Sequence, residues 1–324
     1  MKAIVQDEYG PLNDVVKLQE IDEPTVSDGG LLVQVRAASI HVGDWIVMKG
    51  EPLIMRPMFG VRAPKARVLG TDLAGQVESV GKDVTRFKPG DEVFGWCEGA
   101  FAEYACAGED QFVSKPANLT DEQAAAVGVS AFAALHGLRD QGKVQAGQKV
   151  LINGASGGVG TFAVQIAKSY GAEVTGVAST GNVDMLRSIG ADHVIDYTKE
   201  DFTSGEQRYD FILDNVGNRS PSEMRRILTP DGTLQPNGGG HSSGRWFGPL
   251  GSVLTSAVSS VFIRQQGSPY LSKSNSDDLV VLKELVETGK VTPVIDKTYP
   301  LKETAEALAH VGDGHAQGTT VITM

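Results

Sequence analysis

Residues 149–168 read Lys-Val-Leu-Ile-Asn-Gly-Ala-Ser-Gly-Gly-Val-Gly-Thr-Phe-Ala-Val-Gln-Ile-Ala-Lys, which is an apolar run, a glycine-rich turn and an amphipathic segment. This order predicts a buried strand, a tight turn and a helix. Glycines at 154, 157 and 160 would let the backbone approach a pyrophosphate and would direct the helix N-terminus at its charge. The stretch is a variant of the dinucleotide-binding fingerprint. The alternative is a tight turn that binds no ligand.

The next predicted strand, residues 173–178, bears on which dinucleotide would bind. In NAD-binding sheets an acidic residue about 20 positions after the glycines holds the ribose 2′-hydroxyl. Here the strand runs into Ser179-Thr180-Gly181-Asn182, which contains no carboxylate and also no lysine or arginine. Small hydroxyl and amide groups tolerate a 2′-phosphate that a carboxylate would repel. The sequence therefore favours NADP(H) over NAD(H).

Length and composition narrow the class of protein. A chain of 324 residues predicts two domains. The formal net charge of -11 argues against nucleic acid or an anionic membrane as a partner, because both reward a basic face. Only Cys97 and Cys106 are present, so neither a disulfide framework nor a four-cysteine zinc site can form. No apolar run reaches membrane-spanning length, and we expect a cytoplasmic protein.

The pattern along the chain predicts an α/β protein with two kinds of domain. Residues 1–118 read as short strands separated by Gly, Pro and Asp turns, and a helix follows, with Thr120 as its N-cap. From about residue 148 to 239 strands alternate with helices, which is typical of a doubly wound parallel sheet. The tail, residues 291–324, returns to short strands around one helix at 301–309 and is expected to pack on the N-terminal domain.

One segment has no clear motif. Between Gly238 and Gln266 a helical stripe of apolar residues is predicted. Three interpretations stay open: a helix packed on its own domain, a lid over the substrate, and a helix at a subunit contact. The stripe consists of Leu250, Val253, Leu254, Ala257, Val258, Val261 and Phe262.

The order of the two domains, with a β domain before a mid-chain dinucleotide unit, resembles the medium-chain dehydrogenase/reductase superfamily. Residues 38–45, 69–75 and 214–217 carry the resemblance together with the glycine turn and the tail. The nearest group is the zinc-free quinone oxidoreductases, both zeta-crystallin-like and reticulon-interacting-protein-like. The resemblance implies a GroES-like catalytic domain at 1–123 and 290–324, a Rossmann domain at 124–289, and a homodimer.

Two departures from zinc-dependent relatives bear on the chemistry. Such relatives would carry a Cys near Ile40-His41 and a His-Glu pair after Gly70, where this chain has Thr71-Asp72. Without zinc an alkoxide lacks its usual stabilisation, whereas an electrophilic quinone or enone needs less help to accept hydride. We therefore expect a zinc-independent, NADPH-dependent reductase of quinones or α,β-unsaturated carbonyls. The alternatives are an alcohol dehydrogenase or ketoreductase, and a nucleotide-binding regulatory protein with little turnover.

His41 is the candidate catalytic residue. It stands where many of these reductases have Asn beside the nicotinamide, and it could donate to the substrate oxygen or relay a proton. The alternative is a packed histidine with no catalytic role. No metal ligands are predicted. The glycine turn, the predicted strand ends and the resemblance together give these cofactor-binding candidates: Asp44, Ser130, Gly154, Ala155, Ser156, Gly157, Gly158, Val159, Ser179, Thr180, Asn182, Tyr197, Asn215, Val216, Asn237, Gly238 and Gln317.

Overall fold

The structure is a computed structural model, and it describes residues 1–237, 267, 270, 272–314 and 316–324. The chain forms two compact units. The first comprises Met1–Phe132, Lys273–Gly289 and Pro293–Met324, and the second comprises Ala133–Ser272 and Lys290–Thr292. Compared with the sequence-based boundaries, residues 124–132 and 273–289 group with the first unit instead of the second, and residues 290–292 group with the second instead of the first. Gly238 and the apolar stripe at 250–262 lie outside the described residues.

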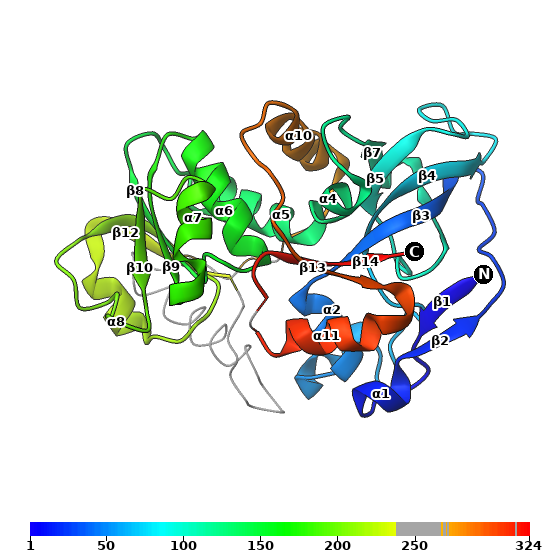
Figure 1. The fold of residues 1–324 in the computed structure, drawn as a ribbon, viewed down its shortest axis with the longest axis horizontal. Coiled ribbons are helices and arrows are strands. Elements are labelled where there is room, and N and C mark those ends of the chain that lie inside the picture. Colours follow the sequence, from blue (N-terminus) through cyan, green and yellow to red (C-terminus); the bar gives the residue numbers. More distant parts are fainter. Residues whose placement is uncertain (238–266, 268–269, 271, 315) are drawn as a thin grey trace. The chain divides into compact units, whose positions relative to one another are not determined.

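The second unit is built on a five-stranded parallel sheet in the order β10-β9-β8-β11-β12. The middle of its central strand is apolar, with Val150, Leu151 and Ile152 all 0% exposed, as expected for a strand covered on both faces. Figure 1 shows α6 and α7 on one side of this sheet and α8 on the other. The strands are β8 (Lys149–Asn153), β9 (Glu173–Ala178), β10 (His193–Asp196), β11 (Tyr209–Asp214) and β12 (Leu228–Pro236), and the helices are α6 (Gly158–Ser169), α7 (Val183–Ser188) and α8 (Pro221–Arg226).

The predicted alternation of strands and helices holds in this unit with one exception. No helix separates β10 from β11, and residues 197–208 form a succession of turns instead. Asp201 stabilises these turns, because its carboxylate accepts hydrogen bonds from the backbone N–H and the hydroxyl of Thr203 at 3.0 and 2.9 Å. Such local bonds compete with helix formation.

The first unit contains a seven-stranded sheet in the order β13-β14-β3-β4-β5-β7, with β6 also paired to β3. The C-terminal strand β14 pairs antiparallel with β3, so that Thr320 lies opposite Ile40. The predicted return of the tail to the N-terminal sheet is therefore confirmed. A separate pair, β1 (Lys2–Val5) and β2 (Lys17–Glu20), precedes it, and the sheet strands are β3 (Gly30–Ile40), β4 (Asp72–Val80), β5 (Glu92–Trp96), β6 (Tyr104–Gly108), β7 (Phe112–Ser114), β13 (Ile295–Pro300) and β14 (Thr319–Thr323).

Short helices cover the ends and faces of this sheet. Helix α11 packs against α2, and its Leu308 joins Leu31, Leu73 and Phe101 in the core, where these four side chains are each 0% exposed. The burial of such side chains is the main source of stability for the unit. The helices are α1 (Leu12–Val15), α2 (Val42–Lys49), α3 (Arg56–Phe59), α4 (Asp121–Ala125), α5 (Gly128–Leu135), α10 (Ser276–Glu287) and α11 (Thr304–Gly312).

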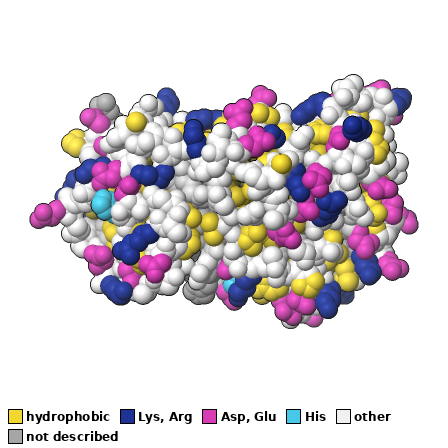
Figure 2. All heavy atoms as spheres, turned by 45° about the horizontal axis from the view of Figure 1, so that its top comes forward, with side chains coloured by type: hydrophobic (Ala, Val, Ile, Leu, Met, Phe, Trp, Pro, Cys, Tyr) yellow, Lys and Arg dark blue, Asp and Glu magenta, His cyan; other side chains and the backbone are white. Residues whose placement is uncertain are grey.

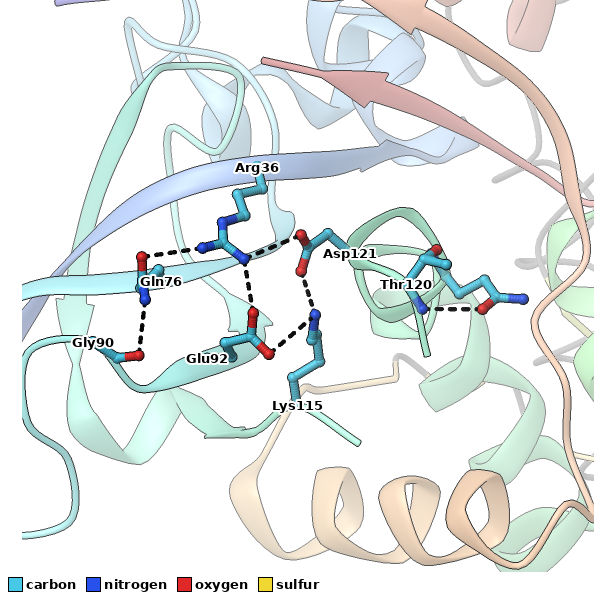
Figure 3. Close-up of polar contacts among 8 residues, drawn as sticks. Arg36, Gln76, Gly90, Glu92, Lys115, Thr120 and Asp121 are labelled. Atoms are coloured by element: carbon cyan, nitrogen blue, oxygen red, sulfur yellow. Dashed lines mark hydrogen bonds and ion pairs between the residues drawn. The ribbon is translucent and has the colours of Figure 1, made fainter. Parts of the chain in front are cut away.

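A closed network of charges anchors α4 to the sheet (Figure 3). Arg36 of β3 donates to Glu92 of β5 at 2.8 Å and to Asp121, the first residue of α4, at 3.5 Å. Lys115 completes the ring, 2.6 Å from Asp121 and 3.4 Å from Glu92. The predicted N-cap is also present, since the Thr120 hydroxyl accepts from the backbone N–H three residues later at 3.2 Å.

The surface carries charges of both signs. On the face shown in Figure 2, basic and acidic side chains are interspersed and apolar ones are scattered between them. Within the described residues, no helix combines the length and the apolar character needed to cross a bilayer.

Candidate cofactor-binding and catalytic sites

The glycine turn has the form of a phosphate cradle. It connects β8 to α6, and Gly157 is the N-cap of that helix. Gly154 has a φ of +73°, and a Cβ there would lie 2.7 Å from Val216 Cγ2. A Cβ on Gly160 would lie 2.2 Å from the Gly154 carbonyl oxygen. Both glycines are thus required by the packing of the unit itself.

Gly157 differs from these two glycines. Among the described residues the nearest atom to a Cβ built on it is the Gly154 carbonyl oxygen at 3.8 Å, so none of them excludes a side chain at this position. The space above this residue faces the first turn of α6, where backbone N–H groups lack intrahelical acceptors. An open approach to a helix N-terminus fits the pyrophosphate of a dinucleotide. Ala155, Ser156, Gly158 and Val159 make up the rest of this turn.

Side-chain amides connect the carboxyl ends of β8, β11 and β12. Asn153 is 2% exposed and donates to Asp214 Oδ1 at 2.8 Å. Asn215 donates to the Asn153 carbonyl at 3.1 Å and accepts from the Asn237 side chain at 2.7 Å. Asp214 also accepts from the backbone N–H of Val216 at 3.1 Å. This is the edge of a parallel sheet where ligands bind, and the network holds the predicted residues there.

Two members of this network, Asn153 and Asp214, are not among the sequence-predicted site residues. Both are polar residues that end buried strands, and this signal in the sequence could have identified them. Asp214 fixes the loop after β11, because it binds two successive backbone N–H groups, those of Val216 and Gly217.

A carboxylate from the neighbouring strand lies beside the carboxyl end of β9, and sequence reasoning missed it. Thr180 donates to Asp196 Oδ2 at 2.6 Å, and Asp196 is the last residue of the neighbouring strand β10. Hydrogen bonds from the hydroxyls of Thr180 and Thr198 hold the pKa of Asp196 well below its usual range. Lys199 lies 2.9 Å from the same carboxylate and is 67% exposed. A negative and a positive group therefore both flank the predicted ribose position.

The other residues predicted to bind the cofactor near the end of β9 are Ser179, Asn182 and Tyr197, and they lie close to Thr180 in the chain or in the sheet. Asn182 donates to the Ser179 hydroxyl at 3.1 Å, and its own side-chain oxygen is buried without a hydrogen-bond partner among the described residues. Tyr197 follows β10 directly, binds the Ala178 carbonyl through its backbone N–H at 3.1 Å, and is 50% exposed. Its ring is available to a ligand.

His41 lies in the first unit, between β3 and α2. Its backbone N–H donates to Asp44 Oδ2 at 2.9 Å, and its Nε2 lies 3.4 Å from the same oxygen. Burial raises the pKa of Asp44, and the nearby His41 opposes that rise. Asp44 therefore anchors the start of α2 and holds the imidazole. Ser130, in α5, is 7% exposed, and Gln317, just before β14, is exposed.

The described residues do not offer a zinc site. No three His, Cys, Asp or Glu side chains among them converge in a way that could hold a metal ion. Cys97 is buried, and burial raises the pKa of its thiol, which opposes formation of the thiolate that zinc requires.

Comparisons with known proteins agree with this architecture. The family described as alcohol dehydrogenase GroES-like domain matches residues 27–117, and the family described as zinc-binding dehydrogenase matches residues 189–322. The mitochondrial NAD(P)H oxidoreductase RTN4IP1 of Mus musculus is 34% identical over 100% of this chain and 89% of its own length. The chloroplastic NADPH-dependent alkenal/one oxidoreductase of Arabidopsis thaliana is 31% identical over 99% of this chain and 79% of its own length.

A solved structure shows the same fold over the whole chain. The quinone oxidoreductase from Coxiella burnetii aligns with a TM-score of 0.84 and 29% identity, and the alignment covers 100% of this chain and 99% of that one. Both domain types are thus found together in a single related structure.

Proposed function

Because the chain belongs to the medium-chain dehydrogenase/reductase superfamily and is an oxidoreductase, we propose that it reduces quinones or α,β-unsaturated carbonyls with NADPH and without zinc. The observation that carries this proposal is the open turn at Gly157, at the start of α6 and beside the amide network of the strand ends. Relatives named as a quinone oxidoreductase and an alkenal/one oxidoreductase support the substrate class.

The residues of the second unit would hold the cofactor. The turn from Gly154 to Val159 would receive the pyrophosphate, and Tyr197 would lie against the adenosine. Asn215 and Asn237 would bind the cofactor at the strand ends. The cofactor supplies a hydride when bound. His41 would donate a proton to the substrate oxygen on which negative charge develops.

The preference for NADPH is part of the proposal and rests on opposing groups. Ser179 offers its hydroxyl proton to a 2′-phosphate, whereas Thr180 already donates its own to Asp196, and Lys199 offers a positive charge. Asp196 opposes them with a negative charge that is stable at neutral pH. We expect the lysine to prevail because it is largely exposed and can turn toward the phosphate, whereas the Asp196 carboxylate is occupied by hydroxyl donors.

Calorimetric titration of the metal-free protein with NADPH and with NADH tests the proposal directly. Addition of 1,4-benzoquinone and then an enone to the NADPH complex should oxidise the cofactor, followed as loss of reduced-nicotinamide absorbance. Binding without oxidation across the acceptors would favour a regulatory nucleotide-binding protein. If neither NADPH nor NADH binds, the glycine turn is not a dinucleotide-binding site and the proposal fails.

We also propose that the protein acts as a homodimer in the cytoplasm. Light scattering measures the oligomeric state directly, and a monomer under turnover conditions would contradict the proposed homodimer. Imaging of the tagged protein in its own cell tests the proposed cytoplasmic location.

A further inference from the structure

Asp72 is a buried acid in the first unit, at the end of the sheet that carries His41. It is the first residue of β4, opposite Ser39 of β3 and Trp96 of β5, and it is 1% exposed. Its Oδ2 accepts the backbone N–H of Val129, near the start of α5, at 2.7 Å. The Ser39 hydroxyl lies 3.4 Å from the same oxygen. Both of these donors, the Val129 N–H and the Ser39 hydroxyl, therefore lie at Oδ2 of Asp72.

The other oxygen of Asp72, Oδ1, is buried without a hydrogen-bond partner among the described residues. Helix α5 packs directly on this carboxyl group, and a Cβ on Gly128 would lie 2.0 Å from Asp72 Cγ. The group is thus held tightly in a place where its ionised form is poorly solvated. An unsatisfied buried oxygen of this kind is costly unless it carries a proton or meets a donor.

His41 lies in the same corner. It follows Ser39 by two residues, and residues two apart on an extended chain face the same side. Ser39 lies directly opposite Asp72, so His41 is a diagonal neighbour of the acid. The His41 Nε2 atom is also buried and makes no hydrogen bond within the described part of the chain, and it lies 3.4 Å from Asp44 Oδ2. Its ring lies over Gly43, where an added Cβ would be 2.7 Å from two ring atoms.

We propose that Asp72 is a positioning residue that supplies His41 with the proton which His41 passes to the substrate oxygen. This inference rests on the proposed function. Once the substrate has accepted a hydride, its oxygen carries negative charge. The N–H bond of the His41 imidazolium breaks and an O–H bond forms on the substrate. The O–H bond of the Asp72 carboxylic acid then breaks to reprotonate His41, and the Asp72 carboxylate regains a proton from solvent.

The ionisable groups around Asp72 are consistent with this role. Burial raises its pKa to about 6, opposed by His41 and the Val129 N–H, and reinforced by Asp44. On the β5 side the neighbouring group is Cys97, whose pKa is raised by burial first and by Cys106 and Asp72 in addition. The α5 side contributes a backbone amide and no titratable group. The titratable side chains that act on Asp72 in this corner are therefore His41 and Asp44.

Replacement of Asp72 by Asn tests the relay in turnover, because Asn keeps an oxygen for the Val129 N–H but cannot carry the proton. We expect kcat with NADPH and 1,4-benzoquinone to fall about tenfold or more, to lose its dependence on pH near 6, and to recover on addition of formic acid. KM for NADPH should stay within about twofold, since the cofactor-binding turn is untouched. The control, Asp296→Asn, alters another carboxylate–histidine pair of the same unit, with His310, and should keep the wild-type pH profile.

A second measurement does not depend on turnover. Carbon-13 NMR of the Asp72 carboxyl group should show its midpoint near 6 in the wild type and a higher midpoint in His41→Gln, because the favourable interaction with the imidazolium is lost. An unchanged midpoint, or a kcat loss in Asp72→Asn that is equal at every pH and not recovered by formic acid, overturns the inference. A wild type that reduces no acceptor refutes the proposed function, and the NMR result still decides whether the two groups are coupled.

Discussion

Thr180 at the end of β9 donates a hydrogen bond to Asp196 at the end of β10, with 2.6 Å between the two oxygens. The turn after β9 contains no carboxylate of its own, yet the parallel pairing of the two strands places Asp196 beside it. The predicted ribose position is thus flanked by a carboxylate from the next strand, and the choice between NADPH and NADH depends on the balance between that carboxylate and Lys199.

Asp196→Asn should strengthen NADPH binding. The substitution removes a negative charge near the 2′-phosphate and frees Lys199, whose charge is now paired with that carboxylate at 2.9 Å. An ion pair whose lysine is largely exposed is worth about 1 kcal/mol, or about fivefold in Kd. NADH should bind nearly as before, as measured by calorimetry.

Asp192→Asn is the matched control for that experiment. Asp192 lies just before β10, at the other end of the strand, and pairs with Lys168 at 2.7 Å. The change in charge is the same, but the predicted ribose is remote from it. Equal gains in NADPH affinity from both variants would show that the gain comes from the net charge of the protein. They would contradict a local effect of the Asp196 carboxylate on the 2′-phosphate.

Gly157→Ala should separate binding from folding. Within the part of the chain that the structure describes, the new Cβ comes no closer than 3.8 Å to another atom, so the melting temperature should change by no more than about 2 °C. The methyl group would occupy the approach to the N-terminus of α6, and NADPH affinity should fall by about tenfold or more.

Two further glycines serve as references for Gly157. Gly29→Ala places a Cβ with nothing within 4 Å and should change neither stability nor binding. Gly160→Ala forces a Cβ to within 2.2 Å of a backbone oxygen and should lower stability itself. Retention of full NADPH affinity by Gly157→Ala would show that the cofactor does not use this turn.

The sequence predicted the parts of the site that depend on local pattern. The glycine turn, β9 and the Thr120 cap each follow from adjacent residues and appear as expected. Contacts that depend on strand order could not be predicted in this way. Asp196 lies 16 residues from Thr180 in sequence, and the Asn153–Asp214 bond spans 61 residues.

The same limit applies to the acid next to His41. Asp72 is one of many acidic residues in the chain, and nothing adjacent to it in the sequence marks it as buried. Its importance appears only when β4 pairs with β3 and α5 covers its carboxyl group. The missing helix between β10 and β11 has a local cause instead, the Asp201–Thr203 turn, which helical periodicity alone does not reveal.

Gly43→Ala should move the His41 ring while keeping the fold. The Cβ would lie 2.7 Å from ring atoms Cε1 and Nδ1, and the imidazole can rotate away more easily than backbone could shift. Gly43 lies in the first turn of α2, where alanine is the better helix former by up to about 1 kcal/mol, so stability should be equal or higher.

Turnover should nevertheless fall in Gly43→Ala if His41 delivers the proton. We expect kcat with 1,4-benzoquinone to drop by about tenfold, with NADPH affinity unchanged. Thermal melting, calorimetry and steady-state kinetics on one preparation give the three quantities. Wild-type kcat in this variant, together with a displaced His41 resonance in NMR, would assign His41 to packing.

Asp72 should make the stability of the protein fall as pH rises from about 4 to about 7. The folded-state pKa of about 6 lies above the ordinary value of 3.8, so folding favours the protonated acid. The stabilisation from this group is complete below the ordinary value and is lost as pH rises through 6. The difference between the two pKa values corresponds to on the order of 3 kcal/mol.

Asp72→Asn removes this dependence, because the amide does not ionise. Relative to the wild type, the variant should therefore gain urea resistance between about pH 4 and about pH 8, whatever its absolute stability at either pH. Taking the difference between the two proteins cancels the other carboxylates, which titrate in both. Asp192→Asn should show almost no change over this range. Burial of Asp192 is outweighed by the hydrogen bonds from Lys168 and from the Val174 N–H, which lower its pKa, so its contribution varies with pH mainly below the ordinary value of 3.8. A constant difference between wild type and Asp72→Asn across this range would mean that the Asp72 carboxyl group is ionised throughout and has no proton to give.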